Sequence, residues 1–147
     1  MKIAIGSDHA GFSLKTEIIN HLKEISFEDL GTFSEASCDY PDYISQVALK
    51  VKENNPSLGI VICGSGVGAS MVANKVKGIR AALCFNEEMA EMAKRHNNAN
   101  ILALGARIIQ KETALAMIKK WLSAPFEGGR HQDRLQKIKL LEDSSFK

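Results

Sequence analysis

Cys63 is the residue whose surroundings most clearly favour chemistry. It follows the apolar residues 60–62 and opens a loop in which glycines at positions 64, 66 and 68 alternate with small residues. Such a loop leaves backbone N–H groups uncovered, and a helix beginning after it adds the positive end of its dipole. We therefore predict an anion-binding loop with a cysteine at its rim. There the thiolate could act as a nucleophile or a general base; the alternative is a small buried hydrophobic residue.

The glycine loop matches none of the common phosphate loops in full. No lysine follows Gly64 and Ser65, as a Walker loop requires, and Ala69 stands where cysteine phosphatases have an arginine. The spacing is G-x-G-x-G rather than G-x-G-x-x-G. Glu87, about twenty residues further on, leaves a dinucleotide site as a weak alternative.

Asp8 and His9 lie in a second loop flanked by glycines. They could contact a ligand, or form a local turn with a solvent-exposed histidine. His96, before two asparagines, could carry a proton at neutral pH or only end a helix.

Arg130 and Arg134 are four residues apart at the start of a predicted helix, so they share a face. Two guanidinium groups suit a phosphate. They could also be ordinary surface arginines, or be neutralised by the neighbouring Asp133.

Strands alternate with helices along the chain. Apolar runs predict strands over residues 2–5, 27–30, 60–62, 79–85 and 100–104. Helical spacing predicts helices over residues 14–25, 41–51, 69–77, 89–96, 106–122 and 130–141, with 142–147 as a solvated, mobile tail. This pattern predicts a three-layer αβα sandwich with a flavodoxin-like parallel sheet in the order 2-1-3-4-5. Ligands then bind where the winding reverses, so the loops after the first and third strands should face each other.

Length and composition are those of one globular domain, residues 1–147. A net charge of +2 with scattered basic residues does not indicate a nucleic-acid partner. No run of about 18 apolar residues or signal peptide is evident, so no membrane association is expected. Three cysteines, at 38, 63 and 84, form no metal or disulfide pattern, which favours the cytoplasm.

Motifs along nearly the whole chain resemble the type B ribose-5-phosphate isomerases. They are GSDHAG at residues 6–11, DYP at 39–41, CGSGVG at 63–68, ANK at 73–75, GIRA at 78–81, HNNAN at 96–100 and GGRHQDR at 128–134. The resemblance implies reversible conversion of ribose 5-phosphate and ribulose 5-phosphate through a cis-enediolate. It implies no metal and no organic cofactor, and a homodimer or a dimer of dimers.

The resemblance also implies residue roles. Cys63 would be the general base, His96 would open the sugar ring with Asp8 nearby, and Ser65, where relatives usually have threonine, would move a proton between oxygens. Substrate contacts would come from Asp8, His9, Tyr40, Gly64, Ser65, Gly66, Val67, Gly68, Asn97, Arg107, Arg130 and Arg134. The family's site lies at a dimer interface, so some of these should come from the partner subunit.

Two features bear on the choice among relatives. Some relatives use a glutamate just after the glycine loop as the base, but this chain has Ala69 there, which leaves Cys63. Galactose-6-phosphate isomerases divide the site residues between two different chains, whereas this chain carries them together. The pentose enzyme is therefore favoured. An isomerase of a six-carbon sugar phosphate, such as allose 6-phosphate, and a non-catalytic phosphate- or nucleotide-binding module are the alternatives.

Overall fold

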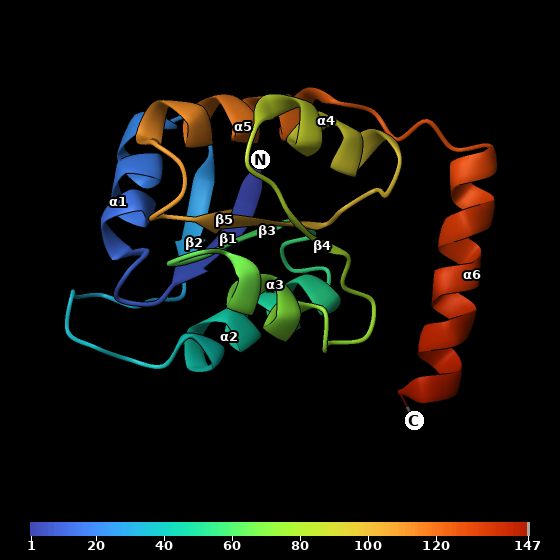
Figure 1. Cartoon of the computed structure of the whole chain (residues 1–147), viewed down its shortest axis with the longest axis horizontal. Helices are drawn as coiled ribbons and strands as arrows, with labels where there is room; N and C mark the ends of the chain where they lie inside the picture. Colours follow the sequence, from blue (N-terminus) through green and yellow to red (C-terminus); the bar gives the residue numbers. More distant parts are fainter. Residues whose placement is uncertain (147) are drawn as a thin grey trace.

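A computed structural model describes residues 1–146 as a parallel five-stranded sheet between two helical layers (Figure 1). The strands are β1 (Lys2–Ser7), β2 (Ser26–Asp29), β3 (Gly59–Cys63), β4 (Ala81–Leu83) and β5 (Ile101–Gly105). The helices are α1 (Phe12–His21), α2 (Tyr40–Lys52), α3 (Val67–Ala73), α4 (Glu87–Arg95), α5 (Lys111–Ser123) and α6 (Arg130–Ser145). The predicted α/β class and layering are confirmed.

The β3 strand shows why this sequence is covered on both faces. All five of its residues are buried, and successive side chains of a strand point to opposite faces. Ile60 and Ile62 pack with α1, α4 and α5, whereas Val61 and Cys63 pack with α2 and α3. The Cys63 side chain therefore belongs to the layer formed by α2 and α3.

The order of the last two strands differs from the prediction. The sheet runs β2-β1-β3-β5-β4, so β5 lies inside the sheet and β4 forms its edge. An interior parallel strand must be apolar on both faces. All five residues of β5 are buried, while β4 has only three residues and all are half-buried. The predicted reversal between β1 and β3 is confirmed, because these two strands pair directly.

The helix predicted over residues 106–122 begins only at Lys111. The backbone N–H groups of Ala106 and Arg107 donate to the carbonyls of Cys63 and Gly64, both at 2.9 Å, rather than to a helix. The segment after β5 is therefore a turn joined to the glycine loop.

Other boundaries shift in the same way. α3 begins two residues before its predicted start and ends at Ala73, and β4 is shorter than predicted at both ends. α6 continues to Ser145, because Glu142 accepts the Gly78 N–H at 2.7 Å and Asp143 pairs with Lys77 at 3.0 Å. The mobile tail predicted from residue 142 is thus wrong for residues 142–145, and Lys147 lies outside the described residues. No helix within residues 1–146 has both the length and the apolar character needed to cross a bilayer.

Candidate active site

A cavity of about 510 Å³ opens at the carboxyl ends of β1, β3 and β5. Its walls come from the turns after these strands and from the first turns of α2 and α3. The lining residues are Asp8, Tyr40, Cys63, Gly64, Ser65, Val67, Gly68, Met71, Arg107 and Ile108. The two loops expected to face each other across the sheet therefore share this cavity.

The glycine loop holds the Cys63 sulfur against a backbone donor. The Gly66 N–H points at Sγ with a nitrogen–sulfur distance of 3.2 Å, and the Val67 N–H donates to the Ser65 hydroxyl at 3.2 Å. The Cys63 sulfur therefore has a backbone hydrogen-bond donor directly beside it. Gly66 itself is buried and is not among the cavity-lining residues, and its N–H points at the Cys63 sulfur.

Only glycine fits at position 66. Its φ is +80°, in the left-handed region. A β-carbon there would also lie 2.9 Å from the backbone carbon of Leu104. The loop can turn tightly over β5 because that atom is missing.

Arg107 lies across Gly64 at the rim of the cavity. A β-carbon built on Gly64 would lie 2.9 Å from a terminal guanidinium nitrogen of Arg107. The Arg107 backbone N–H also donates to the Gly64 carbonyl. The missing side chain thus lets a planar, five-donor cation rest directly beside the loop, a placement suited to a phosphate.

Gly64→Ala is expected to raise the KM for a sugar phosphate about tenfold, with a smaller change in kcat. The new methyl group would displace the Arg107 guanidinium, and one lost charge-assisted hydrogen bond is worth about 1.5–3 kcal/mol. Steady-state kinetics measures both constants. In an Arg107→Ala background the same change should have almost no further effect. An undiminished effect there would show that Gly64 acts through something other than Arg107.

The loop after β1 holds Asp8 and His9 in defined orientations. Asp8 is buried, and its Oδ1 accepts the Gly11 N–H at 3.0 Å, which keeps the carboxylate at the cavity wall. His9 Nδ1 accepts the Cys38 N–H at 3.2 Å. Because Nδ1 is the acceptor, the neutral imidazole carries its proton on Nε2. His9 is half-buried beside the cavity and is not among its lining residues.

Three further residues line the cavity beside the polar groups. Tyr40, at the start of α2, lies against Gly68, where a β-carbon would come within 2.7 Å of its ring. Met71 and Ile108 also line the cavity and are 60% and 57% exposed. Both lie in segments for which helical spacing predicts a helix, and neither was assigned to the site. That pattern does not distinguish a core face from an apolar cavity wall, so sequence reasoning missed them.

The other predicted site residues lie at the opposite end of the sheet. His96 and Asn97 precede β5, whereas Arg107 follows it and Cys63 pairs with Gly105 at its carboxyl end. At about 3.3 Å per residue, β5 alone separates the two ends by about 13 Å. Arg130 and Arg134 are exposed on α6. The structure thus divides the predicted residues into a cavity group and a second group of His96, Asn97, Arg130 and Arg134.

His96 stacks on His131, a residue that sequence reasoning assigned no role. Their ring centroids are 4.2 Å apart and their planes differ by 11°. Glu127 Oε1 lies 3.8 Å from His96 Nε2 and 3.5 Å from His131 Nε2. Glu127 lies in the loop before α6, so its contact with His131 does not follow from helical spacing and no local sequence signal indicated it.

This cluster brings three potential metal-ligand atoms within 4.8 Å of one another. An imidazole nitrogen, however, directs its lone pair in the plane of its ring. Two rings stacked nearly parallel cannot both direct a lone pair at one ion between them. The arrangement fits a stacked pair sharing one carboxylate better than a metal centre.

His131 is expected to make stability depend on pH. Burial lowers the pKa of His131, and the positive charges of His96, Arg130 and Arg134 lower it further, against the opposing effect of Glu127. As the pH falls, the unfolded chain takes up this proton first, at about pH 6.5. The stability from neutral His131 is therefore present above that pH and lost as the pH falls through the lower pKa of the folded state.

In His131→Gln, the unfolding temperature should thus fall less than in the unchanged protein between about pH 7.5 and about pH 5. Thermal unfolding followed by circular dichroism gives the comparison. His21→Gln is the matched control, because His21 is exposed on α1. Equal pH slopes in the unchanged protein and His131→Gln would contradict the prediction.

The sequence is similar to known sugar-phosphate isomerases. A profile described as ribose/galactose isomerase matches residues 3–138. Ribose-5-phosphate isomerase B of Escherichia coli is 48% identical over 143 residues, covering 96% of each chain.

Solved structures of similar proteins superpose closely on this one. A Clostridium thermocellum ribose-5-phosphate isomerase B gives a TM-score of 0.96 at 51% identity, over 98% of this chain and 99% of the other. A Mycoplasma genitalium ribose-5-phosphate isomerase B with bound ribulose 5-phosphate gives 0.93 at 46% identity, over 98% of this chain and 97% of the other.

Proposed function

The chain belongs to the ribose/galactose isomerase family, and on this premise we propose that it interconverts ribose 5-phosphate and ribulose 5-phosphate. The observation that carries the proposal is the cavity at the ends of β1 and β3, where Cys63 lies between a glycine loop and Arg107. Each group in it suits one part of an open-chain sugar phosphate. A relative with ribulose 5-phosphate bound, at 46% identity, supports the substrate class.

Cys63 is proposed as the general base. Its thiolate removes the proton from C2 of the aldose, and the electron pair moves to form a C1–C2 double bond with negative charge on O1. The Ser65 hydroxyl transfers a proton between O2 and O1. The Cys63 thiol then returns its proton to C1, which leaves a carbonyl at C2. Sulfur and hydroxyl both line the cavity, as this sequence of steps requires.

The anionic intermediate is stabilised by backbone donors. The first N–H groups of α3 have no acceptor within the helix, and the glycines of the loop allow a ligand to approach them. Arg107 and the His9 Nε2–H are proposed to bind the phosphate and sugar hydroxyls. The charge that develops on the enediolate and the charge already on the phosphate thus have separate partners.

His96, Asn97, Arg130 and Arg134 are proposed to complete the cavity of a second copy of the chain. One subunit cannot bring these residues to its own Cys63, because β5 separates them. Among the described residues, neither Arg130 nor Arg134 forms an ion pair, which leaves both for a phosphate. In a homodimer, His96 of one subunit would open the sugar ring in the cavity of the other. This arrangement accounts for the separation within one chain and for the two arginines without ion pairs.

A six-carbon sugar phosphate is the alternative substrate, since the family includes galactose isomerases. Initial rates with ribose 5-phosphate, allose 6-phosphate and galactose 6-phosphate, each with excess EDTA, test the proposal. We expect the highest kcat/KM with ribose 5-phosphate, unchanged by EDTA. A higher value with a six-carbon substrate would overturn the pentose assignment. Tight binding without turnover of any of them would favour a non-catalytic binding module.

A further inference from the structure

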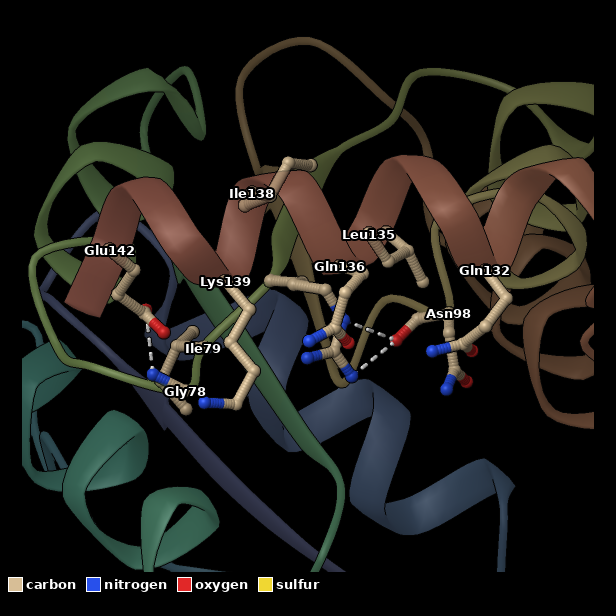
Figure 2. Close-up of a pocket in the computed structure, with 10 residues that line it drawn as sticks. Gly78, Ile79, Asn98, Gln132, Leu135, Gln136, Ile138, Lys139 and Glu142 are labelled. Atoms are coloured by element: carbon tan, nitrogen blue, oxygen red, sulfur yellow. Dashed lines mark hydrogen bonds between the residues drawn. The ribbon is translucent and has the colours of Figure 1, made fainter. Parts of the chain in front are cut away.

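Arg80 binds the backbone of the loop that carries His96 and Asn97. Its Nε donates to the carbonyl of Asn97 at 3.2 Å and to that of Asn98 at 3.0 Å, and its Nη2 donates to Asn98 at 2.9 Å. Two of its donors therefore converge on the two residues that directly follow His96. In Figure 2, dashed lines mark the bonds that the Asn98 carbonyl accepts.

The Arg80 backbone is held on the same loop. Its N–H donates to the Asn100 side chain at 2.8 Å, and its carbonyl accepts the Asn100 N–H at 3.1 Å. The Asn100 amide in turn donates to the Gly78 carbonyl at 2.9 Å. These bonds fix the backbone of Arg80, and they thereby limit where its guanidinium can lie relative to the Asn97 and Asn98 carbonyls.

The loop follows the C-terminal end of α4, whose last carbonyls are already paired. α4 ends at Arg95, and the Asn98 and Ala99 N–H groups donate to the Lys94 and Ala93 carbonyls at 3.1 and 2.9 Å. Asn98 has a φ of +44°, in the left-handed region that asparagine adopts more readily than most residues. The Asn97 and Asn98 carbonyls lie beyond the helix, and the Arg80 guanidinium supplies charged donors to them.

The surroundings keep the Arg80 guanidinium in place. It lies in a groove of about 220 Å³ between this loop and α6, with Gln132, Leu135 and Gln136 on the helix side (Figure 2). Burial lowers the pKa of Arg80, while the charge of Glu142 acts in the opposite direction. An arginine pKa starts far above neutrality, so the group stays charged and its hydrogen bonds stay strong.

We propose that Arg80 is a positioning residue for isomerisation: by binding the Asn97 and Asn98 carbonyls, it sets the direction in which His96 and Asn97 face the partner's cavity. The inference rests on the roles proposed above for these two residues. Arg80 lines the groove beneath α6 and not the cavity that holds Cys63, so it is assigned a positioning role rather than a catalytic one.

Arg80→Ala should lower kcat with ribose 5-phosphate by about 10- to 100-fold, because small misplacement of catalytic groups has effects of this size. The loss should be clearly smaller with ribulose 5-phosphate, which has no ring to open. Arg80→Lys should recover part of the activity, since one ammonium cannot match the guanidinium fork. Ethylguanidinium added to Arg80→Ala should restore turnover in a saturable way.

Lys139→Ala is the matched control. Lys139 is a cation that lines the same groove, but its ion pair is with Asp143, and among the described residues it forms no hydrogen bond with residues 96–98. Its replacement should leave both kinetic constants unchanged. Equal losses in Arg80→Ala with the two substrates, or no rescue by ethylguanidinium, would overturn the positioning role.

A measurement independent of turnover separates this inference from the proposed function. In Arg80→Ala, amide hydrogen exchange of Asn98 and Ala99 should become faster and the His96 ring resonances should shift. Unchanged exchange and resonances would overturn the inference by themselves. If His96→Ala itself retained full turnover, the proposed role of His96 would be wrong. If His96→Ala lost turnover while Arg80→Ala kept it, only the role of Arg80 would be wrong.

Discussion

Cys63→Ala should reduce turnover by about 10³-fold or more while leaving sugar-phosphate binding nearly intact. Removing a general base has effects of this order, and Cys63, the proposed base, lines the cavity beside the glycine loop. Arg107 and the loop N–H groups, which are proposed to hold the ligand, would remain. Steady-state rates give the loss, and isothermal calorimetry gives the Kd.

Cys84→Ala is the matched control for Cys63→Ala. Cys84 is also a buried cysteine, but it packs in the core with α4 and α5, and burial raises its pKa to about 11. It is therefore neither a base nor a nucleophile at neutral pH. Its replacement should cost some stability and leave kcat unchanged. Comparable turnover in the Cys63 and Cys84 variants would remove the thiolate from the mechanism.

A hybrid dimer of Cys63→Ala and His96→Ala subunits should have about half the activity of the unchanged dimer, although each variant alone is nearly inactive. If His96 acts in the partner's cavity, the hybrid has one site with both residues and one with neither. Coexpression of the two variants with different tags allows the hybrid to be purified and assayed.

The same hybrid separates the two arrangements of the site. If Cys63 and His96 acted within one chain, each subunit of the hybrid would lack one of them, and the hybrid would be as inactive as its parents. A hybrid of Cys63→Ala with Arg107→Ala is the matched control. Both residues line one cavity, so that hybrid should stay nearly inactive.

Several parts of the fold followed from local sequence. The apolar, β-branched run before Cys63 specified a strand buried on both faces, and it is β3. The strand order could not be read in the same way. Whether β4 or β5 pairs with β3 depends on which strand best fills an interior position, a comparison between segments far apart in the chain.

The turn after β5 illustrates the same limit. Ile108 and Ile109 have helical spacing with the residues that follow, so local sequence favoured a helix there. The N–H groups of Ala106 and Arg107 instead meet the carbonyls of Cys63 and Gly64. This alternative set of acceptors exists only after β3 and β5 have paired, and local periodicity does not contain it.

The sequence by itself determined the chemical groups of this protein: a cysteine before a glycine loop, a histidine at a helix end, paired arginines and the family to which they belong. Only the tertiary structure decided that these groups separate into a cavity holding Cys63 and Arg107 and a distant cluster built on His96. The physical reason is that motifs record order along the chain, whereas β5 places Asn97 and Arg107, which lie on either side of it in the sequence, at opposite ends of the sheet.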